Sequence, residues 1–171
     1  HPGNRIVIAG RGIEPGTGTW LTDVVREECD AVRVGALGGP APVEEILNGG
    51  LCSGVVASDF DEVCRLTVQA LHSTRYRLYA TDDLRGVELS GAVVPVLAAL
   101  LGLARSLPGA GVGIHAMVLT RALAEVGRLA RALSADEATV FGLAGLGDLV
   151  AVHAAPGQPY FDAGAALARG E

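Results

Sequence analysis

The sequence predicts an α/β fold that gives way to an all-α part near residue 83. Short β-branched runs alternate with helical patterns up to that point, and only helical patterns follow it. Composition adds a third observation: half of the 171 residues are hydrophobic but only 4% are aromatic. A core made mainly of Ala, Val and Leu follows, and the chain is long enough to bury it.

The first part alternates four predicted strands with three predicted helices. Each strand is a short apolar, β-branched run: 5–9, 32–37, 54–57 and 76–80. The helices are expected between these runs, at 20–29, 43–47 and 60–71. Thr19 is a candidate N-cap for the first helix, because its hydroxyl suits that position. This alternation is typical of α/β organisation.

The second part carries only helical patterns. They cover roughly 85–106, 115–133 and 136–142, with a last one near 162–169. Asp136 suits the first turn of the third helix, where a carboxylate is favourable. The apolar run Val93–Leu103 is shorter than the roughly 20 residues that cross a bilayer, so we expect no membrane span.

Charge and cysteine usage exclude several classes of function. The net charge is −6 without a basic cluster, which argues against a nucleic-acid surface and suits a cytoplasmic protein. All 13 basic side chains are Arg, so no lysine can act as acid, base or Schiff-base former. The three cysteines form no CxxC, which predicts buried, reduced thiols, and no metal-ligand spacing is present.

Two glycine-containing runs carry most of the functional information. Residues 86–95 read GVELSGAVVP, and residues 142–150 read GLAGLGDLV. Glycines as dense as those of the second run let the backbone pass close to a ligand or to a neighbouring helix. The carboxylate of Asp148 lies in apolar surroundings and therefore needs a partner or a helix end to cap. Arg121 is one candidate partner.

These runs resemble the GVELGGALKN and GLAGLGDL motifs of NAD(P)-dependent glycerol-3-phosphate dehydrogenases. The resemblance continues through residues 12–18, 37–40, 79–83 and 120–125. It implies the late strands of a Rossmann-like NAD-binding domain over residues 1–83 and part of an α-helical substrate domain over 84–171. The chain would then be an internal segment of a longer dehydrogenase-like protein.

The resemblance also implies a reaction and its reactants. The family interconverts dihydroxyacetone phosphate and glycerol 3-phosphate for phospholipid synthesis, with NAD or NADP as cofactor. It therefore implies a small phosphorylated substrate for this chain. Within residues 1–171 there is no G-x-G-x-x-G run between a strand and a helix, so binding of the dinucleotide by this chain alone is not expected.

Four candidate site residues follow from the resemblance. Arg11 comes after the first strand and matches a family lysine beside substrate and cofactor; its guanidinium can hold a phosphate. Gly39 and Pro40 match a turn beside the substrate phosphate, where backbone N–H groups can cradle an anion. Asp148 matches the carboxylate that orients the catalytic lysine. No metal site is implied.

The sequence departs from the family where the chemistry takes place. Val94 and Pro95 stand where the family has its catalytic Lys-Asn pair, and Pro159-Tyr160 stand where it has an Arg-Asn pair. Valine cannot transfer a proton, and general acid–base help is worth roughly 10²–10⁴-fold in rate. We therefore expect a catalytically impaired member of the family, a pseudoenzyme.

Two alternatives remain open from the sequence. In one, the chain is an active oxidoreductase with an altered substrate, and His153, Asp148 or a residue outside this segment takes the proton. In the other it is a non-catalytic interaction module, in which the Ala/Leu-rich run Val93–Ala104 buries against another copy as a homodimer.

Overall fold

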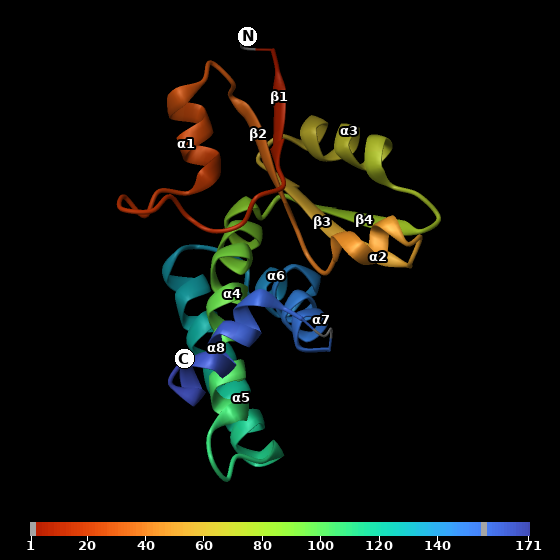
Figure 1. The fold of residues 1–171 in the computed structure, drawn as a ribbon. Coiled ribbons are helices and arrows are strands. Elements are labelled where there is room, and N and C mark those ends of the chain that lie inside the picture. The colour runs from red at the N-terminus through yellow and green to blue at the C-terminus, as the bar shows by residue number, and fades with distance from the viewer. Residues whose placement is uncertain (1–2, 155–156) are drawn as a thin grey trace.

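A computed structural model gives the fold, in which residues 3–154 and 157–171 are described (Figure 1). Four strands form one mixed sheet in the order β1-β2-β3-β4. They are β1 (Arg5–Ile8), β2 (Arg33–Gly38), β3 (Cys52–Ser58) and β4 (Tyr76–Thr81). The outer pairs are parallel and β2 pairs with β3 antiparallel. Every strand expected from the sequence is present, but the antiparallel pair was not foreseen.

Three helices connect the strands: α1 (Leu21–Glu28), α2 (Val43–Leu47) and α3 (Asp61–Leu71). The prediction of Thr19 as N-cap of the first helix was wrong. Trp20 holds that position and makes no side-chain capping bond. The hydroxyl of Thr17 instead accepts from the backbone N–H of Thr19 within the preceding loop.

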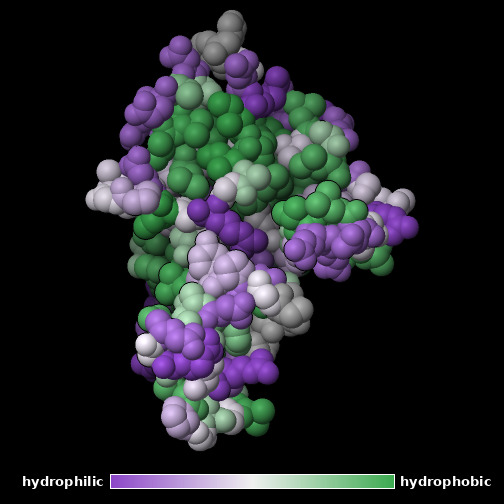
Figure 2. Space-filling view, viewed as in Figure 1, coloured by the Kyte–Doolittle hydropathy of each residue, from purple (hydrophilic) through white to green (hydrophobic). Residues whose placement is uncertain are grey.

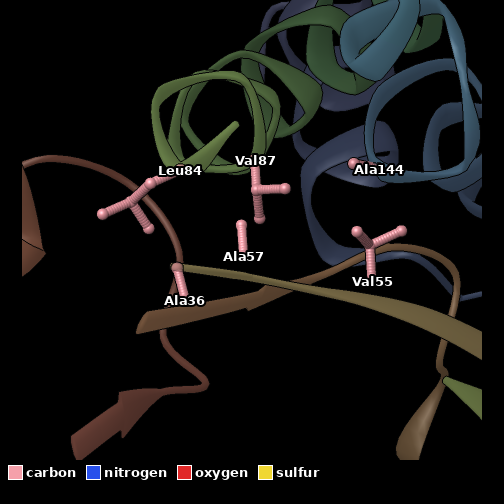
Figure 3. Packing of buried hydrophobic residues seen from close by; sticks show 6 residues of the cluster. All are labelled: Ala36, Val55, Ala57, Leu84, Val87 and Ala144. Carbon is pink, nitrogen blue, oxygen red and sulfur yellow. The ribbon is translucent and has the colours of Figure 1, made fainter. Parts of the chain in front are cut away.

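Alternate residues of β3 serve two different cores. Val56 packs with Cys64 and Leu78 beneath α3, on one face of the sheet. Val55 and Ala57 point to the other face, where they meet the first turns of α4 (Leu84–Ser106), as Figure 3 shows. The period of two in a strand explains this division.

The second part is helical throughout the described residues. After α4 come α5 (Val112–Ala132), α6 (Glu137–Phe141), one turn of π-helix η1 (Leu143–Gly147), α7 (Asp148–Ala154) and α8 (Pro159–Arg169). The π turn and α7 were missed; the π turn, LAGLG, has low helix propensity because of its glycines, and α7 follows it directly. Asp136 is the N-cap of α6, not a residue of its first turn, and accepts from the N–H of Ala138 at 2.8 Å.

Helix α4 is the axis that joins the two parts (Figure 1). Asp83 caps its N-terminus by accepting from the backbone N–H of Gly86 at 2.9 Å, and its second oxygen accepts from the N–H of Asp136 at 3.0 Å. The helix is long and apolar enough to cross a membrane by length and composition alone, with a hydropathy of 2.0. More than half of that apolar window is buried by the rest of the chain, as in the core helix of a globular fold.

Two glycines allow α4 and α8 to meet backbone to backbone. A Cβ on Gly102 would lie 2.0 Å from the carbonyl oxygen of Phe161. A Cβ on Gly164 would lie 1.8 Å from the carbonyl oxygen of Ala99. Neither position accepts a side chain without displacement of a helix, so the glycine pair sets how closely α8 approaches α4.

The cysteines divide by environment. Cys52 and Cys64 are buried free thiols, as the sequence predicted, whereas Cys29 is exposed and does not fit that prediction. Burial raises the pKa of both buried thiols.

Candidate functional site

A cavity of about 210 Å³ lies where α4, α7 and the start of α8 meet the segment between β2 and α2. Its lining is mostly apolar and includes one cation and one carboxylate. The lining residues are Arg11, Ala41, Pro42, Val94, Pro95, Ala98, Asp148, Ala151, Val152, Gln158, Pro159 and Tyr160.

An ion pair between Arg11 and Asp148 forms the polar wall of this cavity. Nη1 of Arg11 donates to Oδ2 of Asp148, and Nη2 donates to Oδ1 at 3.1 Å. The same Nη2 donates to the backbone carbonyl of Gly39 at 3.4 Å. Arg11 therefore links the loop after β1, the turn after β2 and the start of α7, and three of the four candidate site residues lie together.

Asp148 pairs with an arginine, as the sequence suggested, but the partner is Arg11 and not Arg121. Arg121 lies on the exposed side of α5, away from the buried carboxylate of Asp148. There it forms an ion pair with Glu125 at 3.1 Å, one helical turn away. An i,i+4 spacing makes that local partner available without any tertiary contact.

The glycine-rich run places Asp148 at the cavity. The backbone N–H of Gly147 donates to the carbonyl of Gly142 at 2.9 Å, which closes the wide π turn just before Asp148. A Cβ on Gly145 would lie 2.1 Å from the carbonyl oxygen of Val140 and 3.1 Å from Oγ of Ser90 on α4. The run thus passes close to a neighbouring helix, one of the two roles that its glycines allowed.

A second glycine contact seats Arg11 on α4. A Cβ on Gly91 would meet the Cα and Cβ of Arg11 at 3.8 Å. Gly39 adopts a positive φ of 96°, and a Cβ there would lie 3.2 Å from Cα of Gly54. The carbonyl of Gly39 is thereby held toward Arg11. Pro40, the fourth candidate, does not line the cavity, whereas Ala41 and Pro42 do.

Burial dominates the electrostatics of the pair. Asp148 is only 3% exposed, whereas the side chain of Arg11 is 38% exposed. Desolvation of the carboxylate raises the pKa of Asp148, and the hydrogen bond and charge of Arg11 lower it only in part. The attraction is weakened because the guanidinium is partly solvated.

Val94 belongs to the hydrophobic core at the cavity wall. It is 2% exposed and packs with Ala98, Leu101 and Leu149. Helix α4 continues through Pro95, which lies beside it in the cavity wall. The two pairs that replace the family's Lys-Asn and Arg-Asn, Val94-Pro95 and Pro159-Tyr160, both line this one cavity.

Part of the cavity lining was not predicted from the sequence. Gln158, Ala151 and Val152 line the cavity but belong to no motif, so only the fold identifies them. The side chain of His153 lies outside the described residues. Among the residues that the structure describes, no cluster of His, Cys, Asp or Glu side chains suits a metal ion.

The β1-α1-β2 unit does not fit the pyrophosphate of a dinucleotide. A long loop, residues 9–20, separates strand from helix, where a pyrophosphate site needs a tight glycine turn. The first turn of α1 carries Asp23, whose carboxylate repels an anion and already pairs with Arg26 and Arg85. This loop is therefore not a pyrophosphate site for NAD(P).

Comparison with known proteins gives concordant matches over both parts. A family model for the N-terminus of NAD-dependent glycerol-3-phosphate dehydrogenase matches residues 1–64, and one for its C-terminus matches residues 83–171. The glycerol-3-phosphate dehydrogenase [NAD(P)+] of Ectopseudomonas mendocina is 38% identical over 98% of this chain and 49% of its own length. That of Acinetobacter baylyi is 40% identical over 97% and 46%.

Solved structures agree with the sequence matches. The crystal structure of glycerol-3-phosphate dehydrogenase from Coxiella burnetii superimposes with a TM-score of 0.91 at 32% identity, over 98% of this chain and 51% of that one. The Dunaliella salina structure, at 20% identity and a TM-score of 0.88, shares the fold. This chain spans about half the length of the curated relatives it matches. The chain belongs to the NAD-dependent glycerol-3-phosphate dehydrogenase family.

Proposed function

We propose that this chain is a catalytically impaired member of the family that keeps a ligand-binding cavity. The observation that carries the proposal is the buried Val94 in the cavity wall, at the position that the resemblance matches to the catalytic lysine. A valine there can shape a cavity but cannot give or take a proton.

The neighbouring groups support the same conclusion. Asp148 would orient a lysine ammonium in an active relative, and here it is held by Arg11. A guanidinium stays protonated at all accessible pH values, so Arg11 cannot replace a lysine that transfers protons. The pair therefore serves to hold structure and ligand.

The proposal also assigns the two parts of the chain to two domains. Residues 1–83 would be the late part of the NAD-binding domain and residues 84–171 part of the substrate domain, since α4 begins at Leu84. Use of NAD(P) and of a phosphorylated glycerol belongs to the full-length relatives. A cytoplasmic location is part of the same proposal.

A chimera tests the catalytic proposal directly. This chain is joined to the regions of the Ectopseudomonas mendocina relative that it does not match, and oxidation of NADH and NADPH with dihydroxyacetone phosphate is measured. A Val94→Lys/Pro95→Asn double variant of the chimera is assayed beside it. Circular dichroism and thermal unfolding check that both proteins fold.

The expected result is a parent chimera at least about 10²-fold slower than the intact relative. A gain in turnover in the double variant would assign the loss to these two positions. Turnover of the parent near that of the relative would refute the impairment. It would favour an active oxidoreductase in which Asp148 or His153 moves the proton.

An interaction module remains the second candidate. Most of the run Val93–Ala104 is buried or half-buried within the chain, but Val96 and Leu100 are exposed on α4. Figure 2 shows a further gathering of apolar side chains over the sheet end of the molecule. Sedimentation equilibrium of the chain and of a Val96→Glu/Leu100→Glu variant tests a homodimer: dissociation in the variant alone would support it.

A further inference from the structure

We propose that the cavity takes a compact, uncharged aliphatic ligand that carries one carbonyl or hydroxyl oxygen, in place of a phosphate ester. This inference rests on the proposed function, because it concerns the ligand of the same cavity. Three properties of the cavity carry it: its charge balance, its apolar walls and the free donors of Arg11.

The charge balance disfavours a phosphate. Among the described residues that line the cavity, Arg11 and Asp148 alone carry a formal charge at neutral pH, and they neutralise each other. A phosphate dianion would add two negative charges beside a carboxylate that is 3% exposed, and the described part of the lining offers no cation besides Arg11. Burial of unpaired charge is costly, whereas an uncharged ligand leaves the pair intact.

The walls favour a small apolar body. Val94, Pro95, Ala98, Val152 and Pro159 present carbon to the cavity. A volume of about 210 Å³ is smaller than the usual range of roughly 300–1,000 Å³ for drug-sized ligands. The positions where the resemblance implies lysine and arginine here provide a hydrocarbon surface, so ligand binding is driven by apolar contact.

Arg11 supplies one orienting contact. Its guanidinium carries five N–H groups. One on Nη1 donates to Asp148, and those on Nη2 donate to Asp148 and to Gly39. Among the described residues, no hydrogen bond uses its Nε–H or the second N–H of Nη1. Its side chain is 38% exposed, so these donors can meet a single ligand oxygen.

A binding experiment on the full chain tests the ligand class. Backbone amide NMR spectra are recorded during titration with cyclohexanone and, separately, with glycerol 3-phosphate and inorganic phosphate at matched ionic strength. We expect saturable shifts with cyclohexanone at Val94, Ala98, Asp148 and Ala151. Binding of both phosphates should be at least about tenfold weaker.

Three variants locate and explain the binding. Ala151→Leu fills the cavity and should weaken cyclohexanone binding at least about tenfold, whereas Ala116→Leu on the exposed face of α5 should leave it unchanged. Val94→Lys adds a cation and should reverse the preference toward phosphate. Thermal unfolding checks that each variant folds.

The outcomes separate this inference from the catalytic proposal. Tighter binding of phosphate than of cyclohexanone, or equal binding in the Ala151→Leu variant, would overturn the ligand class even if the chimera is inactive. Ketone preference together with an inactive chimera supports both. Turnover of dihydroxyacetone phosphate without cyclohexanone binding would overturn both.

Discussion

The two halves of α4 are stabilised by different interactions. The N-terminal half packs Leu84 and Val87 on the sheet and adds directional polar contacts centred on Glu88. Its buried carboxylate accepts from the backbone N–H of Thr22 at 3.0 Å, from the hydroxyl of Thr22 at 2.9 Å and from Arg85 at 3.0 Å. Arg85 also pairs with Asp23 at 2.6 Å, which ties α1 to the same half.

In the C-terminal half, close backbone approach and apolar packing dominate, and the guanidinium of Arg105 lies over the ring of Phe161, 6.0 Å from its centroid. Gly102 and Gly164 bring the backbones of α4 and α8 into contact. Val94, Ala98, Leu101 and Leu149 fill the adjoining core. Dispersion and hydrophobic burial, which have no preferred direction, stabilise this half.

The difference explains where the cavity lies. Directional bonds determine the register of α4 against α1 and the sheet, because each acceptor must face its donor. Glycine contacts determine only how near α8 can come. The cavity lies at the boundary between the two halves, where Val94, Pro95 and Ala98 line it, and the Arg11–Asp148 ion pair lies at the same boundary.

The largest expected effect comes from the apolar half. Gly164→Ala places a methyl group 1.8 Å from the carbonyl oxygen of Ala99, so a helix must move. We expect the free energy of unfolding, measured by urea denaturation, to fall by about 3 kcal/mol. Gly113→Ala, where a Cβ meets nothing within 4 Å, should instead gain about 0.5 kcal/mol. Equal effects at both sites would show that the close crossing does not limit stability.

A smaller effect is expected in the polar half. Glu88→Ala leaves the buried N–H and O–H of Thr22 without an acceptor, and should cost about 2 kcal/mol in urea denaturation. Glu125→Ala removes a carboxylate from an exposed ion pair and should cost less than about 0.5 kcal/mol. A Glu88→Ala loss no larger than that control would mean that water replaces the missing acceptor.

At the boundary, the pH dependence of stability shows whether burial or the pairing with Arg11 dominates the pKa of Asp148. Because the pKa of Asp148 is raised in the folded state, the unfolded state loses its proton first. Its ionisation therefore removes stability as the pH rises from about 3.9, the unfolded value, through the raised folded value. Relative to the parent, Asp148→Asn should gain stability across that window. Thermal unfolding between pH 3 and pH 8 measures this, and a relative loss over the window would contradict it.

The smallest effect is expected for the arginine that the sequence suggested as partner. Arg121→Gln should change the free energy of unfolding by less than about 0.5 kcal/mol, because the Arg121–Glu125 pair is exposed. It should also leave the pH dependence assigned to Asp148 unchanged. Arg11→Gln should instead increase that dependence, since it removes the contact that partly lowers the pKa.

The local sequence pattern predicted most helices and strands, but it missed the glycine-rich π turn and the helix that follows it. Residues 43–47 were predicted to be helical with the bounds that α2 has, and the change to helices near residue 83 matches the start of α4. The π turn and α7 were missed because the favourable packing of Gly145 on Ser90 lies outside the local sequence. The antiparallel pairing of β2 and β3 was likewise not contained in the alternation of strands and helices.

The sequence by itself determined the family, the order of the strands and of most helices, the need of Asp148 for a partner and the absence of lysine. These follow from local periodicity, motif and residue chemistry. Only the tertiary structure decided that the partner is Arg11, 137 positions away in the chain, and that Val94, Pro159 and Tyr160 share one cavity. The reason is physical: several arginines suit a buried carboxylate equally well by charge, and the fold brings one of them within hydrogen-bond distance.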